Sequence, residues 1–473
     1  MKKISILFIA LIALFSASCD KDFETVNTDP NNPVAVPAHL LLGSIVRVNQ
    51  NAIYGMQQGG DMGMCWAQHV SKVQYNDEER YIPRRGAIDG IWNTLYASVI
   101  ADSQSMYTLA ESEGNTNLQG VSLILQANGF QILTDLYGPI PYTEFNKSGN
   151  LKPVYDSQEV VYDGIIDLLT QADALLASGS GDIPASSDLV YGGDVTKWRK
   201  LANSLKFKAL MRISKVKNVN TELQALVNGG KLMSSNSDSA QISYLAAQPD
   251  ANPIYETIVY GTRAEYKMSS VLVSKLETLN DDRLNVFAAL NNDDEFVGNI
   301  PGEENPGNYT GFSSLGSFYL NPKLPGVILS NAQVQFLLAE AANEGYISGG
   351  SVAATTYYNN GINANFTFNG IGALAATYIT QGNVVLGNQS DSRQKIAEQS
   401  WIALFGQGFE AWTEWRRTGY PALSPAFEAN ETSIPSRLYY NSTELALNKD
   451  SYTAAVGTLT NGDKLTSPLW WMN

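Results

Sequence analysis

Histidine is nearly absent from this chain, which has only His39 and His69 among its 473 residues. The sequence also contains no H-E-x-x-H, C-x-x-C, G-x-S-x-G or P-loop pattern. Those patterns supply metal ligands, redox thiols, an activated serine and a phosphate cradle. The sequence therefore predicts no catalytic residue of these classes and no metal site. We expect His69 to be a satisfied, partly buried side chain rather than a ligand.

Basic residues are also in short supply. Lys and Arg number 31 against 46 Asp and Glu, which gives a formal net charge of −15. Nucleic-acid binding requires clustered Lys and Arg that neutralise phosphates, and electrostatic attachment to anionic lipid requires a basic patch. The composition thus predicts neither a nucleic-acid partner nor an electrostatic membrane contact.

Long hydrophobic runs are limited to one, at the N-terminus. It follows Met1-Lys2-Lys3, extends over residues 4–15, and is followed by Ser16-Ala17-Ser18. About twelve apolar residues are too few to span roughly 30 Å of hydrocarbon as a helix. A basic start, a short apolar core and a small-residue cleavage site are typical of a secretory signal. Residues 1–18 are therefore predicted to be a lipoprotein signal peptide.

Cys19 directly follows the small-residue triplet. This layout resembles a bacterial lipobox, in which the cysteine is acylated and becomes the first mature residue. The acidic patch over residues 20–24 resembles the surface-export signal of Bacteroidetes lipoproteins. We expect lipidation at Cys19, a lipidated tether over residues 19–38, and a formal charge of −17 once Lys2 and Lys3 are lost. The alternative is an ordinary cleaved signal with an incidental cysteine.

Acylation of Cys19 would leave Cys65 as the one remaining cysteine, without a disulfide partner. We expect Cys65 to be a buried, inert thiol. The fold must then rely on its hydrophobic core, which a chain of this length can supply. No Pro/Ser-rich linker or charged tract divides the chain, so residues 39–473 are predicted to form a single domain.

Helical periodicity dominates the rest of the sequence, whereas strand-like alternation is scarce. Apolar residues recur at a spacing of three and four, which places them on one helical face. The helices predicted on this basis cover residues 92–109, 118–137, 157–176, 197–216, 270–279, 330–344, 351–366, 392–405 and roughly 409–417. Ser157 is expected to begin the third of these helices. The sequence predicts a mostly α-helical protein.

Stretches rich in Gly, Pro and Asn separate the helices. Residues 27–33 favour an extended tether that turns onto the body. The longest irregular stretch covers residues 291–322 and carries aromatic side chains that include Tyr309, Phe312, Phe318 and Tyr319. A loop of this length is usually functional or disordered, and its aromatic residues favour an ordered one.

Five segments, in order along the chain, resemble one family. They are TDPNNP at 28–33, LTDLYGPIPY at 133–142, YGGD at 191–194 with WRKLANSL at 198–205, VQFLLAEAA at 334–342, and GFEAWTEWRRTGYP at 408–421. They are similar to the motifs of the SusD/RagB-type outer-membrane nutrient-binding lipoproteins, and the first is typical of the SusD-like subgroup. The five segments span nearly the whole mature chain.

The resemblance implies a scaffold of tetratricopeptide-like helix pairs with an irregular, loop-rich ligand-binding lobe. It also implies a lipid-anchored, surface-exposed protein of the outer membrane that binds an oligosaccharide or, in some members, a peptide. The partner would be a SusC-type TonB-dependent transporter, over which the lipoprotein sits as a lid. The resemblance implies no cofactor and no covalent chemistry.

Sugar binding calls for flat aromatic rings that stack on apolar sugar faces, with amides and carboxylates for the hydroxyls. Two segments, residues 66–92 and 309–319, have this mixture. The ligand-binding residues predicted from them are Trp66, Tyr75, Asn76, Tyr81, Arg84, Trp92, Tyr309 and Tyr319. The alternative for the two tryptophans is a core position, and the exposure of Tyr75 and Tyr81 is left open.

The family motifs mostly predict structure. Tyr137 and Tyr142 are expected to pack against neighbouring helices. Glu410, Arg416 and Arg417 are expected to form a buried ion-pair network, and the alternative is that they face the transporter.

Two other classes of protein stay open. One is a helical glycoside hydrolase, which needs only two carboxylates about 5–9 Å apart, and the other is a structural surface protein. Calcium could be held by the acidic residues at 280–282 or 292–295, but neither matches an EF-hand loop. We expect solvated acidic loops at both places.

Overall fold

The computed structural model of the protein describes residues 36–472. The predicted signal peptide, Cys19, the motif at 28–33 and most of the predicted tether lie outside the described residues. From Ala38 onward the chain forms one compact unit. In the part that the structure describes, no helix combines the length and the apolar content needed to cross a membrane.

Helices make up most of the described chain, as predicted. In the first half they are α3 (His39–Tyr54), the π-helical η2 (Met56–Met64), α4 (Arg85–Thr94), the π-helical η3 (Leu95–Ile100), α5 (Ala101–Ser112), α6 (Thr116–Tyr137), α7 (Gln158–Ala177), α8 (Val195–Ile213) and α9 (Asn220–Gly229). In the second half they are α10 (Pro253–Tyr255), the π-helical η5 (Glu256–Tyr260), α11 (Ser270–Thr278), α12 (Leu284–Phe287), α13 (Asn331–Asn343), α14 (Gly350–Phe368), α15 (Ala375–Ile379), α16 (Gln389–Ala403), α17 (Gly408–Thr418), α18 (Glu444–Leu447) and α19 (Lys449–Thr458). Short 3-10 turns are η4 (Asn236–Asp238), η6 (Gly372–Leu374) and η7 (Trp470–Met472).

The helices predicted from periodicity are all present. The helix predicted at 92–109 is part of a longer run in which α4, η3 and α5 follow one another without a break. Ser157 precedes α7, and its hydroxyl accepts a hydrogen bond from the Val160 N–H at 3.4 Å. This is the expected N-terminal cap, because it satisfies one of the backbone N–H groups that a helix start leaves unpaired.

The helix α3 and the π-helix η2 have no counterpart among the predicted helices. The buried face of α3 includes Asn49 and Gln50, which interrupt the apolar period. The η2 segment is rich in glycine, a poor helix former. A Cβ placed on its Gly63 would lie 2.5 Å from the backbone of Gly408 at the start of α17. The glycines therefore allow η2 and α17 to pack backbone against backbone.

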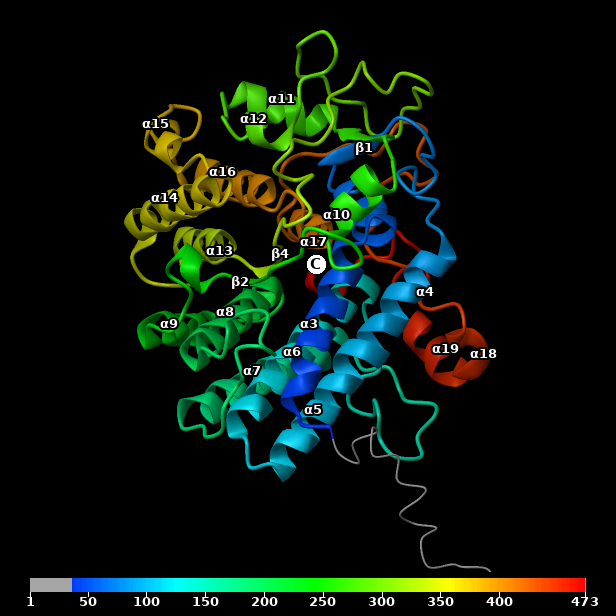
Figure 1. Ribbon diagram of the computed structural model, residues 1–473, viewed down its shortest axis with the longest axis vertical. Helices are drawn as coiled ribbons and strands as arrows, with labels where there is room; N and C mark the ends of the chain where they lie inside the picture. The colour runs from blue at the N-terminus through cyan, green and yellow to red at the C-terminus, as the bar shows by residue number, and fades with distance from the viewer. Residues whose placement is uncertain (1–35, 473) are drawn as a thin grey trace, which may run out of the picture. The chain divides into compact units, whose positions relative to one another are not determined.

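Consecutive helices pack side by side in two groups (Figure 1). In one group α6 contacts α5 and α7, and α7 contacts α8; in the other α13 contacts α14 and α16. Both α6 and α13 are buried on nearly every side, so the hydrophobic core follows these two helices. The described chain is thus a helix-pair scaffold of the tetratricopeptide-like kind, as the sequence resemblance implied.

Strands are few and short in the described chain. The strand β1 (Val70–Lys72) pairs antiparallel with β3 (Tyr266–Met268), with Lys72 opposite Tyr266. The strand β2 (Ala240–Ile242) pairs antiparallel with β4 (Gly326–Leu329).

The loop-rich part of the fold contains β1, α11, α12 and residues 291–322, at the top of Figure 1. Its long loop is ordered, as predicted, because backbone bridges join Ser269 to Asn299 and Ala288 to Leu315.

The motif at 133–142 ends α6 and turns the chain. Gly138 has a φ of +93°, a conformation that a side chain would strain. The Tyr137 hydroxyl donates a hydrogen bond to the Ile88 carbonyl at 2.7 Å, and the Tyr142 ring meets that of Phe130 edge-on at 4.7 Å. The prediction that both tyrosines pack within the fold is confirmed.

Candidate functional site

A cleft of about 700 Å³ opens beside the end of β1. It is lined by three separate parts of the chain, namely Lys72, Gln74, Tyr75, Asn76, Asp77, Glu78 and Arg84 in the first, Arg263 in the second, and Glu304 and Pro306 in the third. The volume lies within the range of about 300–1,000 Å³ that small-ligand sites occupy. This is the region in which the sequence predicted binding residues.

Backbone pairing holds the three parts together. The pairing of β1 with β3 places residue 263 beside the first part, since Lys72 lies opposite Tyr266. The Asn305 N–H donates to the Val73 carbonyl at 2.8 Å. The side-chain amide of Asn76 donates to the Lys72 carbonyl at 2.6 Å and reaches the Glu303 carbonyl at 3.4 Å. These hydrogen bonds of Asn76 tie the loop to the neighbouring segment.

Tyr75 presents an exposed aromatic ring to the cleft. Its side chain is 58% exposed, and the Arg263 guanidinium lies 5.8 Å from the ring centroid. Its backbone is left-handed, with a φ of +62°. Such a conformation costs about 1–3 kcal/mol in a residue other than glycine and persists only where the surroundings enforce it. The fold thus fixes the direction in which the Tyr75 side chain leaves the backbone.

Charged side chains form the floor of the cleft. Arg84 Nη2 lies 2.7 Å from the Asp61 carboxylate, and Arg84 Nε contacts Glu78. Lys72 Nζ lies 3.2 Å from Asp61 and 3.3 Å from Glu78. The Tyr266 hydroxyl donates a hydrogen bond to Asp61 at 2.6 Å. Burial raises the pKa of Asp61, although Lys72 opposes this effect.

Glu79 lies beneath the same loop and is 1% exposed. Its carboxylate accepts hydrogen bonds from the Lys72 N–H at 3.0 Å and from the Asn76 amide at 3.3 Å. Burial raises the pKa of Glu79 to about 7, and the hydrogen bond from Lys72 offsets only part of this rise. The loop that carries Tyr75 is therefore tied to a carboxyl group that titrates near neutrality.

The predicted binding residues divide into two groups. Tyr75, Asn76 and Arg84 line the cleft, and the Tyr309 hydroxyl donates a hydrogen bond to the cleft residue Gln74. The structure brings these four together from the two segments that the sequence singled out. Their role in ligand binding stays a prediction.

The other four predicted binding residues are core side chains, namely Trp66, Tyr81, Trp92 and Tyr319. Trp66 meets Trp412 edge-on at 4.9 Å, and Trp92 meets Tyr137 edge-on at 5.0 Å. The Tyr81 hydroxyl accepts a hydrogen bond from the Ala426 N–H at 2.9 Å.

Tyr319 meets Phe405 edge-on at 4.6 Å, and its hydroxyl donates to Asn369 at 2.8 Å. Packing thus occupies the aromatic faces that a sugar would need, and the structure gives no support to a stacking role for these four residues. For the two tryptophans, the alternative of a core position is the one found.

Seven residues that line the cleft are not among the eight predicted binding residues, namely Lys72, Gln74, Asp77, Glu78, Arg263, Glu304 and Pro306. Arg263 and Glu304 lie in segments whose composition differs little from other polar loops, and only the β1–β3 pairing brings Arg263 to the site. Lys72 is a single charged residue in a short polar stretch, and nothing in its neighbours distinguishes it from other lysines. No pattern in the sequence signals these three positions.

A family model described as "Starch-binding associating with outer membrane" matches residues 30–441. The chain belongs to the SusD-like family. The match covers most of the sequence, and it includes every residue of the cleft. A search of curated proteins by sequence gave no match.

Solved structures of SusD homologues have the same fold. A chitin-binding SusD homologue from Flavobacterium johnsoniae is 25% identical, with a TM-score of 0.81 over 92% of this chain and 98% of that one. A SusD homologue from Bacteroides fragilis is 25% identical, with a TM-score of 0.79 over 93% of this chain and all of the other. A SusD homologue from Bacteroides uniformis is 22% identical, with a TM-score of 0.82 over 92% of this chain and 99% of that one.

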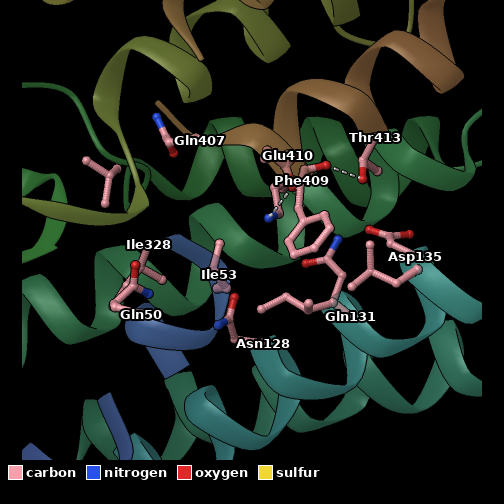
Figure 2. Close-up of a pocket in the computed structure, with 14 residues that line it drawn as sticks. Gln50, Ile53, Asn128, Gln131, Asp135, Ile328, Gln407, Phe409, Glu410 and Thr413 are labelled. Carbon is pink, nitrogen blue, oxygen red and sulfur yellow. Dashed lines mark hydrogen bonds and ion pairs between the residues drawn. The ribbon is translucent and has the colours of Figure 1, made fainter. Parts of the chain in front are cut away.

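The C-terminal SusD-like motif, on α17, surrounds a second and much smaller cavity of about 40 Å³. Figure 2 shows Glu410, Phe409 and Thr413 of α17 facing Gln131 and Asp135 of α6 across it. A monosaccharide does not fit in this volume, so the cavity is a feature of the core.

An ion-pair network lies beside this small cavity, as predicted for the motif. Arg212 of α8, fully buried, lies 2.7 Å from both Glu410 and Glu414 and 3.4 Å from Asp135. Burial alone would raise the pKa of Glu410, but Lys208 and Arg212 lower it to about 2. The network joins α6, α8 and α17 of the SusD-like scaffold.

Arg417 of the same motif pairs with Glu340 of α13 at 2.5 Å and with Glu414 at 2.7 Å. Arg416 donates instead to the backbone carbonyls of Asp135 and Ser436. Arg416, Arg417 and Glu414 are buried, and Glu410 is partly buried. The predicted buried ion-pair network is therefore confirmed for Glu410 and Arg417, whereas Arg416 forms hydrogen bonds and no ion pair among the described residues.

Two other predicted positions also lie in the core of this SusD-like fold. Cys65 is a buried free thiol, and burial raises its pKa well above the usual value, so the prediction of an inert thiol is confirmed. His69 is fully rather than partly buried, 4.6 Å from the Trp401 ring. Burial lowers the pKa of His69 to about 3, which keeps its imidazole neutral.

The two acidic loops differ from one another. Residues 292–295 are exposed, as expected. Asp281, in contrast, is fully buried and forms an ion pair with Arg283 at 2.5 Å. The expectation of a solvated acidic loop at 280–282 is therefore wrong for Asp281, because this carboxylate neutralises a buried arginine.

Proposed function

We propose that this protein is a lipid-anchored protein of the outer-membrane surface that binds an oligosaccharide in the cleft beside Tyr75. It passes the bound oligosaccharide to a SusC-type TonB-dependent transporter and makes no covalent change to it. The family description and the chitin-binding relative support a glycan ligand. The lipid anchor is supported by the sequence around Cys19.

The exposed ring of Tyr75 at the cleft carries the proposal. An exposed aromatic face can stack on the apolar face of a sugar ring. The cleft adds hydrogen-bonding groups at short range, including the half-exposed Arg84 guanidinium and the exposed carboxylate of Asp77. One aromatic face with convergent polar groups is the usual composition of a site for a polar organic ligand.

Replacement of Tyr75 by alanine tests the site. The probes are starch-derived and chitin-derived oligosaccharides, with a peptide library as the second arm, and affinity is measured by calorimetry. We expect a loss of affinity of about tenfold, because an aromatic contact contributes about 0.5–1.5 kcal/mol beyond its buried area. The melting temperature should change little, since the ring is mostly exposed.

The matched control is Tyr107→Ala, a partly exposed tyrosine on α5, at the opposite end of Figure 1 from β1. It should leave affinity unchanged. Tyr81 is left out of the test because it is buried and its removal would disturb folding. Equal affinities of wild type and Tyr75→Ala would exclude the cleft as the binding site. If the protein binds peptides and no glycan, the proposed ligand is wrong and the ligand is a peptide.

The absence of catalysis is tested with the same material. Purified protein incubated with each bound polysaccharide should release no reducing ends above a blank. A steady release of reducing ends would show that the protein is a glycoside hydrolase and not only a binding protein. Such an enzyme needs only a pair of suitably placed carboxylates.

A further inference from the structure

Every cationic side chain that lines the cleft already has a carboxylate partner. Lys72 is almost fully buried between Asp61 and Glu78. Arg84 uses its Nε and Nη2 groups on the same two carboxylates. The third cation, Arg263, donates from Nε to the Glu265 carboxylate at 2.6 Å.

The acidic side chains at the rim have no such partner. Asp77 and Glu304 both line the cleft and are exposed. Among residues 36–472, neither carboxylate takes part in an ion pair. When Asp61 and Glu265 behind the cations are included, the cleft carries two more formal negative charges than positive ones.

Resting on the proposed function, we propose that the cleft selects neutral or amino-bearing glycans and rejects carboxylated or sulfated ones. Asp77 and Glu304 are the residues that set this selectivity. Their carboxylates accept hydrogen bonds from sugar hydroxyls, or pair with a protonated amino group. An anionic substituent placed beside them meets like charges at short range.

The cations that an anion meets in the cleft are already paired. If a uronate or a sulfate draws the half-exposed Arg84 away from Asp61, this fully buried carboxylate loses its shortest ion pair and keeps only Lys72 and the Tyr266 hydroxyl. Removing a partner from a buried charge is costly, whereas the new and more exposed pair contributes little. The net charge of −15 over the whole chain acts in the same direction at longer range.

The first experiment uses the mature full-length chain and matched pairs of polysaccharides. Starch, a soluble β-glucan and chitin oligosaccharides are each presented unmodified and with carboxylate groups introduced at C6, and chitosan oligomers supply the amino-bearing form. We expect the carboxylated form of any bound glycan to bind at least about tenfold more weakly, which equals about 1.4 kcal/mol.

Raised salt provides a second readout. At about 1 M salt the Debye length falls to about 3 Å, so charge repulsion is screened. The difference between the neutral and carboxylated forms should then shrink, while the affinity for the neutral form should stay nearly constant.

Reversing the charge of the two rim carboxylates tests whether they cause the weaker binding of carboxylated glycans. In the double variant Asp77→Lys and Glu304→Lys, affinity for the carboxylated form should rise about tenfold relative to wild type. The matched control is Glu222→Lys with Asp450→Lys, which makes the same change in net charge on α9 and α19, away from the cleft. Circular dichroism checks that both variants are folded.

The outcomes separate the two proposals. Equal or tighter binding of carboxylated glycans by wild type overturns the selectivity but leaves glycan binding in place. An equal rise in the cleft variant and its control also overturns it, because the effect would then come from net charge alone. Failure to bind any glycan, neutral, carboxylated or amino-bearing, overturns the proposed function itself.

Discussion

Burial brings the pKa of Glu79, beneath the cleft, to about 7. A carboxyl group with a raised pKa binds more protons in the folded state than in the unfolded chain, between its ordinary pKa and the raised value. The free energy of unfolding therefore decreases as pH rises through this window, from about 4.5 to about 7. The neighbouring Lys72, Cys65 and Tyr81 do not titrate there, because the pKa of each is raised.

Replacement of Glu79 by glutamine should remove this dependence. Glutamine keeps an oxygen to accept the hydrogen bond from the Lys72 N–H but carries no charge. We expect the loss of stability between pH 5 and pH 8 to be smaller by about 2–3 kcal/mol in the variant, as measured by urea unfolding at each pH. Glu304→Gln, an exposed cleft residue, is the control. An unchanged pH profile in Glu79→Gln would show that Glu79 is charged throughout.

For individual residues, the sequence indicates which side chains have the chemistry to bind a sugar, but it does not indicate which of them are exposed. Tyr75 and Tyr81 lie six positions apart in one polar stretch and both have a positive φ, yet one ring faces the cleft and the other is buried. Tyr81 packs edge-on against Trp66 and accepts a hydrogen bond from Ala426, far along the chain, whereas Tyr75 makes neither contact. Local composition contains no information about those contacts, so half of the predicted binding residues proved to be core side chains.

Among the elements, α17 is joined by buried ion pairs to two other helices. Arg212 and Arg417 join its acidic residues to α8 and α13. Removal of one partner from a buried ion pair leaves an uncompensated charge, which costs about 3–5 kcal/mol. The helix is therefore expected to tolerate substitution poorly at these positions.

The variant Arg212→Ala measures this contribution. Three carboxylates, of Asp135, Glu410 and Glu414, would lose their shared partner. We expect the free energy of unfolding to fall by about 3–5 kcal/mol. The comparison is Lys217→Ala, which breaks an exposed pair with Asp163 and should cost no more than about 1 kcal/mol. Similar losses in the two variants would mean that the network contributes little.

Element prediction succeeded where apolar spacing was regular and failed where it was not. The helices α6 and α13 are buried on almost every side and were predicted with close bounds. The helix α3 was not, because Asn49 and Gln50 lie on its buried face. For η2, the decisive factor is close backbone packing against α17, which only the tertiary structure contains.

For the whole molecule, the family motifs gave the fold in advance, and the cleft was predicted only in part. In the first segment, Tyr75, Asn76 and Arg84 could be predicted, because aromatic and polar side chains are interleaved there. Arg263 and Glu304 could not, because β-strand pairing and loop contacts bring them to the cleft.

Membrane attachment is a prediction at this scale. In the full-length chain, Cys19→Ala should abolish incorporation of labelled fatty acid and move the protein from the membrane fraction to the soluble one. Acyl chains contribute about 0.8 kcal/mol per buried methylene, so no electrostatic contact of this acidic chain can replace them. Cys65→Ala is the control, since that thiol is buried. Continued membrane retention of Cys19→Ala would contradict the lipoprotein assignment.

The cleft is assembled from segments that are remote from one another in sequence, and this has a consequence for biogenesis. Asn76 and the Glu303 carbonyl, which meet at its edge, are 227 positions apart. A ribosome must complete well over half of the chain before the two can meet, and contacts of such long separation form late in folding. A chain that ends before Pro306 lacks one of the three segments that line the cleft. Ligand would also retard unfolding of the entire compact unit rather than of one loop.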